Sequence, residues 1–135
     1  MPPHFFKERN FFMTIMGATN RIDVLKPNVF SQSEKIRWLS VLDGIVKAEI
    51  IDTHEGAEDV VFRPYDEKTE LTQELLIPHP YDEIYIRWLE AQIDYANGEY
   101  EKYNNSIAMY NAAYLAFERY YNRTRKPLEK RFTHF

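Results

Sequence analysis

The chain has 135 residues, of which 44% are hydrophobic and 28% charged, and its formal net charge is −4 at pH 7. This length and composition predict one folded domain with a single core and exclude a disordered chain. The absence of cysteine excludes disulfides and thiolate metal sites, and no apolar run approaches the ~20 residues that a membrane helix needs.

The N-terminal residues MPPHFFKERNFF are interrupted by charged and polar side chains, so they lack the apolar region of a signal peptide. Met13 and Met16 are also plausible starts. We therefore treat residues 1–13 as an extension without an assigned role. The sequence predicts a single domain over residues 14–126 and a tail over residues 127–135.

Two helices are predicted in the first third of the domain. Residues 14–25 (TIMGATNRIDVL) predict a short helix that ends before Pro27, because proline disfavours helical geometry in the residue before it. Ser31 and Glu34 have the spacing of a capping box. Apolar residues then recur at helical spacing, which predicts a second helix up to about Asp52.

Residues 53–81 break the helical pattern. VVFR (60–63) and ELLIP (74–78) are two short β-prone runs around a polar turn, and they predict a small β-hairpin or an extended flap. Prolines at positions 64, 78 and 80 restrict any strands to sheet edges.

The C-terminal half predicts a pair of helices. Asp82 is placed to cap the first helix, and Asn97–Gly98 interrupts the pattern at a position where glycine favours a helix end. A second helix over residues 99–124 would complete an αα-hairpin, with one continuous kinked helix as the alternative. The predicted fold is mainly α: a helical bundle with a long C-terminal αα-hairpin and a small β-hairpin or flap. The apolar stripe expected on the last helix is Tyr103, Ile107, Tyr110, Tyr114, Phe117 and Tyr121.

Residues with catalytic or metal-binding chemistry are few. His54 lies between Asp52 and Glu55, which would suit a small metal site, but a polar helix terminus explains the same residues. No phosphate-binding loop, dinucleotide motif or nucleophile elbow is present. We therefore expect no enzyme, no cofactor and no metal; a small metal-binding enzyme is the least favoured alternative.

Nine of the ten tyrosines fall between Tyr81 and Tyr121, too many for one helix face. Tyrosines off the core face suit protein interfaces, because the ring buries a large area and the hydroxyl finds a partner. Asparagines in the same region add amide donors and acceptors, although chance exposure on a surface helix would also explain them. The predicted interface residues are Tyr95, Tyr100, Asn104, Asn105, Asn111 and Tyr120.

The C-terminal residues are basic while the rest of the chain is acidic. Residues 119–135 carry six lysines and arginines and one acid. A basic arm on an acidic body favours an acidic partner, protein or nucleic acid, although a solvated terminus has the same composition. No helix with a basic recognition face is visible, so a purely DNA-binding role is not predicted.

Two stretches carry a family resemblance: IRWLSVLDGIVKAEIIDTHEG (36–56) and LLIPHPYDEIYIRWLEAQIDYANGEYEKYNNSIAMYNAAY (75–114). They resemble the small helical head–tail connector, or adaptor, proteins of tailed phages and prophages of Gram-positive bacteria. The resemblance covers about residues 14–126.

This resemblance implies a virion structural protein, assembled in the bacterial host cytoplasm as a ring, commonly dodecameric. The ring would lie between the portal and the stopper or head-completion protein and extend the DNA channel, with only transient contact to packaged DNA. The αα-hairpin is our candidate for one subunit interface, and the flap (53–81) for contact with a neighbouring subunit or the stopper. Another neck, tail-completion or assembly factor is the alternative. The residues proposed to dock on the portal are Arg123, Arg125, Lys126, Lys130, Arg131 and Phe132.

Overall fold

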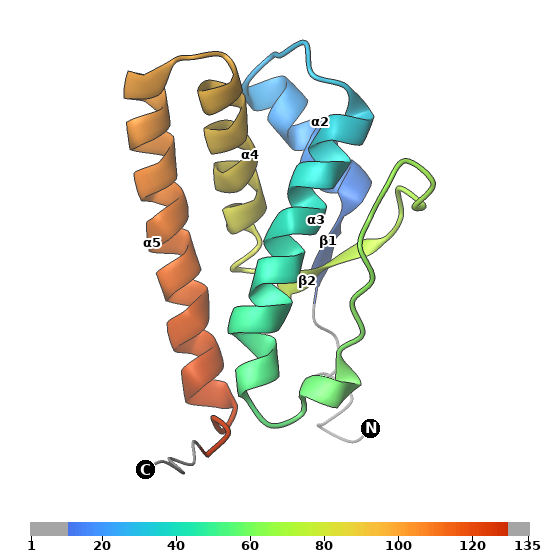
Figure 1. The fold of residues 1–135 in the computed structure, drawn as a ribbon, viewed down its shortest axis with the longest axis vertical. Coiled ribbons are helices and arrows are strands. Elements are labelled where there is room, and N and C mark those ends of the chain that lie inside the picture. Colours follow the sequence, from blue (N-terminus) through green and yellow to red (C-terminus); the bar gives the residue numbers. More distant parts are fainter. Residues whose placement is uncertain (1–10, 130–135) are drawn as a thin grey trace, which may run out of the picture.

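The computed structural model describes residues 11–129 and is mainly helical, as the sequence predicts (Figure 1). Within this range, four α-helices accompany a two-stranded antiparallel sheet, and α4 lies between α5 and α3. The elements in chain order are β1 (Phe12–Thr14), α2 (Ile15–Leu25), α3 (Gln32–Glu49), two short 3-10 helices (Ile51–Thr53 and Ala57–Asp59), β2 (Glu74–Pro78), α4 (Glu83–Ala96) and α5 (Tyr100–Thr124).

The first two helices begin at side-chain caps. The Thr14 hydroxyl accepts a hydrogen bond from the Gly17 amide, and the Ser31 hydroxyl accepts one from the Glu34 amide at 3.1 Å. Each bond satisfies an amide that the first helical turn leaves without a partner. The predicted cap at Ser31 is confirmed, whereas α3 ends at Glu49, before the predicted Asp52, because the chain tightens into a 3-10 turn there.

The sheet pairs different segments from those that the sequence predicts. β2 lies antiparallel to β1, with Phe12 opposite Pro78 and Thr14 opposite Glu74. Of the two forms predicted for residues 53–81, the hairpin between residues 60–63 and 74–78 is wrong, since residues 60–63 form no strand, and the extended flap is the form observed. Hydrogen bonding explains part of this: the Leu76 amide in β2 donates to the Asp43 carboxylate, so it is not free to pair with residues 60–63.

The C-terminal helix pair is an antiparallel αα-hairpin, so the alternative of one kinked helix is excluded. Gly98 allows the tight turn because its φ of 72° lies in the left-handed region that side chains disfavour. The residue before α4, Asp82, makes no capping bond with its side chain. The prediction that Asp82 caps α4 is wrong, because its carboxylate lies 3.2 Å from His79 Nδ1 instead.

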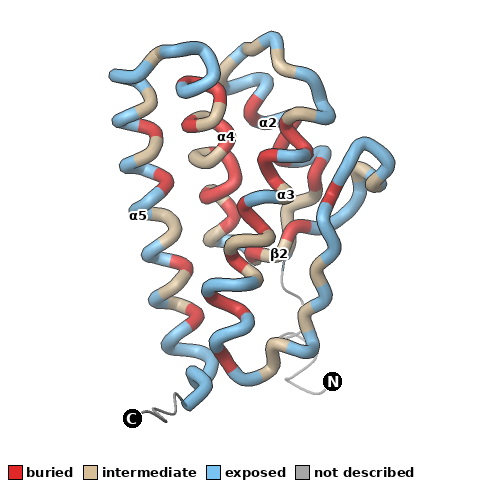
Figure 2. The backbone as a smooth tube through the Cα atoms, in the orientation of Figure 1, coloured by how far each residue is buried: buried red, intermediate tan, exposed pale blue. Residues whose placement is uncertain are grey.

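The core fills the space enclosed by the sheet, α2, α3, α4 and the inner face of α5 (Figure 2). Ile22, Leu42 and Leu89 are fully buried there. On α5 the predicted stripe is confirmed for Tyr110, Phe117 and Tyr121, which are buried. Tyr103, Ile107 and Tyr114 are only partly buried. α5 therefore packs by one face only.

A buried carboxylate on α3 holds three other segments in place. Asp43 is fully buried and accepts hydrogen bonds from the hydroxyls of Tyr85 in α4, at 2.6 Å, and Tyr65 in the flap, at 2.7 Å. It also accepts the Leu76 amide at 3.0 Å. Burial raises the pKa of the Asp43 carboxyl to about 6, while these three donors oppose the rise.

Candidate interaction surface

The turn of the αα-hairpin carries a cluster of tyrosine rings. Tyr95 at the end of α4 meets Tyr100 and Tyr103 of α5, edge to face, at centroid distances of 5.8 and 5.2 Å. Tyr95 is 59% exposed and Tyr100 is 61% exposed. Because these rings support one another while leaving much of their area in solvent, they form a preorganised aromatic surface.

The amides that the sequence assigns to an interface lie on exposed positions of α5. Asn104, Asn105 and Asn111 are all exposed. No side-chain hydrogen bond joins any of the three to another residue in the range 11–129, so their donors and acceptors remain free for a partner.

The outward face of α5 carries no charge over four turns. From Tyr103 to Phe117 the helix has no acidic or basic residue. Met109 and Leu115 are 49% and 46% exposed in this stretch, next to exposed alanines and asparagines. An uncharged helix face of this length in a chain that is 28% charged has the composition of an interface core, where charged residues are depleted.

Tyr120 differs from the other predicted interface residues. The sequence places it away from the packed stripe, but it is half-buried, and its ring stacks on that of Tyr81 at a centroid distance of 4.6 Å. Phe117 lies beside both rings. Tyr120 therefore packs within the subunit, because Tyr81, just before α4, lies against this turn of α5, and its role at an interface stays a prediction.

Part of the predicted portal-docking tail is exposed and part is held against the body. Arg123, Arg125 and Lys126 are exposed, and the Arg125 guanidinium lies 4.6 Å from the centroid of the Tyr121 ring. Backbone hydrogen bonds attach the chain beyond α5 to residues 53–55. Three other predicted residues lie outside the described residues: Lys130, Arg131 and Phe132.

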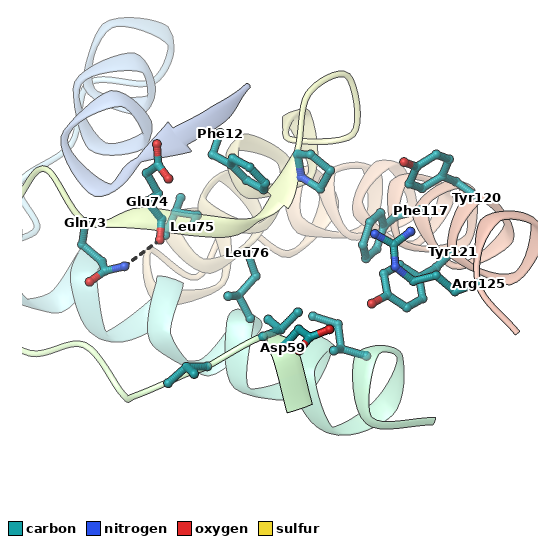
Figure 3. A pocket seen from close by; sticks show the side chains of 14 residues that line it. Phe12, Asp59, Gln73, Glu74, Leu75, Leu76, Phe117, Tyr120, Tyr121 and Arg125 are labelled. Atoms are coloured by element: carbon teal, nitrogen blue, oxygen red, sulfur yellow. Dashed lines mark hydrogen bonds between the residues drawn. The ribbon is translucent and has the colours of Figure 1, made fainter. Parts of the chain in front are cut away.

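A cavity of about 310 Å³ lies between the flap, β2 and the C-terminal part of α5 (Figure 3). Its wall combines apolar side chains, among them Phe12, Leu76 and Phe117, with the polar side chains of Gln73 and Glu74. Asp59 and Arg125 bring opposite charges to the same cavity. Because no nucleophile lies beside a base among these lining residues, the cavity suits binding of a ligand or partner group better than a reaction.

The residues of the alternative metal site have other partners. His54 is buried, with Nδ1 at 2.6 Å from the Ile50 carbonyl and Nε2 at 2.7 Å from Asn122 Oδ1. Asp52 pairs with the Lys47 ammonium. Within residues 11–129 no group of three potential metal ligands is gathered. His54 instead joins the end of α3 to the last turn of α5.

Two buried carboxylates were not singled out by the sequence reasoning. Asp43 is one, and Asp94 on α4 is the other: it accepts hydrogen bonds from the Lys26 ammonium at 2.6 Å and the Ser106 hydroxyl at 3.0 Å. A signal existed, since Asp43 falls four residues after Leu39 and three before Val46, which is the buried face of α3. A charge on an apolar face indicates a hydrogen-bonded junction.

Comparison with protein-family models, curated proteins and solved structures found no match for this chain. Among residues 11–129, no helix combines the length and the hydropathy required to cross a bilayer. The surface described above therefore has to be interpreted from its own chemistry.

Proposed function

We propose that the chain is a structural protein of a tailed-phage virion, a head–tail connector that assembles as a ring between the portal and the stopper protein. The observation that carries this proposal is the exposed, uncharged outer face of α5 from Tyr103 to Phe117. Such a face is costly to leave in water and gains by contact with protein. Among residues 11–129 no comparable arrangement of catalytic groups supports an enzyme, so we propose a role in assembly without catalysis.

The proposed ring requires each subunit to present two different, complementary surfaces. The tyrosine cluster around Tyr95 and Tyr100 is our candidate for the first surface. The flap between α3 and β2, anchored by Tyr65 on Asp43, is our candidate for the second surface or for the stopper contact. The exposed Arg123 and Arg125 at the opposite end of α5 are our candidates for docking on the portal.

Another neck, tail-completion or assembly factor is the second candidate, because the same surfaces could serve it. Deleting the coding sequence from the phage genome separates the two. A connector predicts DNA-filled heads and complete tails that remain unjoined. Abnormal tails would indicate a tail-completion factor, and absent heads an assembly factor. Normal infectious particles would contradict all these roles.

Complementation of the deletion tests the surface itself. We expect the double variant Tyr95→Asp/Tyr100→Asp to fold but not to restore joined particles, because two carboxylates would be desolvated in the contact. The matched control is Val24→Asp, a substitution at an 80% exposed position of α2, which should restore them. Full restoration by the double variant would remove the tyrosine cluster from the proposal.

A further inference from the structure

We propose that two copies of this chain form a two-fold dimer by packing the outer faces of α5 antiparallel to each other, with Ala112 at the centre. The occupant of this helix face is thus a second copy of the same chain. The inference does not rest on the connector role, since it concerns the purified protein alone. It goes beyond that role, because a two-fold contact closes on two copies and cannot by itself generate a ring.

The surface in question lies directly opposite the packed face of α5. At 3.6 residues per turn, the buried residues Tyr110 and Phe117 mark one side of the helix. The other side presents a continuous exposed strip, which Figure 2 shows as the pale outer edge of α5. The central residues of this strip are Asn105, Ala108, Ala112, Leu115 and Ala116.

The side chains of the strip suit close helix packing. Ala112 lies at the midpoint of the strip. When α5 of a second copy packs antiparallel with its own Ala112 at the same point, Ala108 of one copy lies opposite Ala116 of the other. Small side chains at the crossing allow the two backbones to approach, while the half-exposed Leu115 and Met109 supply apolar area beside it. The face can therefore form a well-packed contact with itself.

The charges at the two ends of the strip select the antiparallel direction. Glu101 lies at the N-terminal end, and Arg119 and Arg123 lie at the C-terminal end. All three are exposed, and none belongs to an ion pair within residues 11–129. Antiparallel packing about Ala112 places Glu101 of each copy opposite Arg123 of the other, whereas parallel packing would place like charges together.

The expected dimer is modest in size. The strip from Glu101 to Arg123 is roughly 33 Å long at 1.5 Å per residue. One helix against one helix buries less area than a standard interface, so we expect dissociation in the micromolar range. If the connector role also holds, this dimer is the form that exists before assembly, and a ring neighbour replaces the α5 contact.

Cysteine cross-linking of the purified chain tests the geometry, because the natural sequence has no cysteine. We expect Ala112→Cys to form a disulfide-linked dimer under mild oxidation. An equimolar mixture of Ala108→Cys and Ala116→Cys should cross-link at least fivefold more than either variant alone. The matched control is Val41→Cys, a 43% exposed position on α3, which should give only background cross-linking.

Two results would overturn the inference. One is Ala112→Cys cross-linking no faster than Val41→Cys. The other is Ala108→Cys alone matching the mixture, which indicates parallel packing. Sedimentation velocity provides an independent measurement: Ala112→Arg should abolish the concentration-dependent dimer, whereas Val41→Arg should leave it unchanged. An unchanged dimer in Ala112→Arg also contradicts the inference.

Discussion

Replacing Tyr85 by phenylalanine removes one oxygen atom from the most connected buried site of the protein. The Tyr85 hydroxyl donates to Asp43 at 2.6 Å and accepts the Ile77 amide at 2.8 Å. Tyr85 and Ile77 are fully buried, so water cannot take over either bond without disturbing the core. The side-chain volume hardly changes, so the effect reports hydrogen bonding.

The two lost bonds set the expected magnitude. A hydrogen bond to a charged group contributes about 2 kcal/mol, and a buried amide left without a partner costs about 1 to 3 kcal/mol. We therefore expect Tyr85→Phe to lower the free energy of unfolding by about 3 to 5 kcal/mol. Tyr65→Phe removes only one bond to the same carboxylate, so we expect about 2 kcal/mol there.

Urea denaturation at pH 7, followed by the fluorescence of Trp38 and Trp88, measures both effects. The control is Tyr95→Phe, whose exposed side chain should change the free energy of unfolding by less than about 0.5 kcal/mol. A loss below about 1 kcal/mol for Tyr85→Phe, or a larger loss for Tyr65→Phe, would refute the assignment of Tyr85 as the principal donor to Asp43.

Three further predictions concern stability. Burial raises the pKa of Asp43 to about 6, from about 3.9 when unfolded. The folded state therefore favours the protonated carboxyl, and the stability that this preference contributes is present below about pH 4 and is lost as pH rises to about 6. Asp43→Asn should therefore remove about 3 kcal/mol of pH dependence across this window, measured by urea denaturation at several pH values; an unchanged slope would contradict it. Lys26→Met leaves the buried Asp94 without its cation, and thermal unfolding should show that the free energy of unfolding falls by about 2 to 3 kcal/mol. The control Arg21→Met breaks an exposed ion pair and should cost less than about 1 kcal/mol. Equal losses would argue against a role for burial. Gly98→Ala should cost about 1 kcal/mol because its φ is positive, and no loss in urea denaturation would show that the turn can relax.

The helical part of the fold could be predicted because local rules determine it. The cap at Ser31, the proline after α2 and the glycine at position 98 each act within a few residues, and all correspond to helix ends in the structure. The sheet could not be predicted in the same way. β2 pairs with β1, about sixty residues earlier in the chain. No local pattern in residues 60–63 indicates that β2 has another pairing partner.

The candidate surface was also predicted only in part, because local patterns indicate positions on a helix but not contacts between distant segments. Exposure of Tyr95 and Tyr100 follows from their positions on the helix pair, which the sequence pattern indicates. Tyr120 becomes half-buried only because Tyr81, before α4, stacks on it, and that contact depends on how the two helices are joined. Similarly, the hydrogen bond between His54 and Asn122 links residues that are distant in sequence and have no shared local pattern.

Quantitative mass spectrometry of purified phage particles tests the proposed function most directly. Particles from the phage genome that encodes this chain should contain it at a copy number comparable to that of the portal protein, and it should stay with the head–neck fraction after tails are removed. Its absence from washed particles, while it remains abundant in the lysate, would contradict a structural role in the virion.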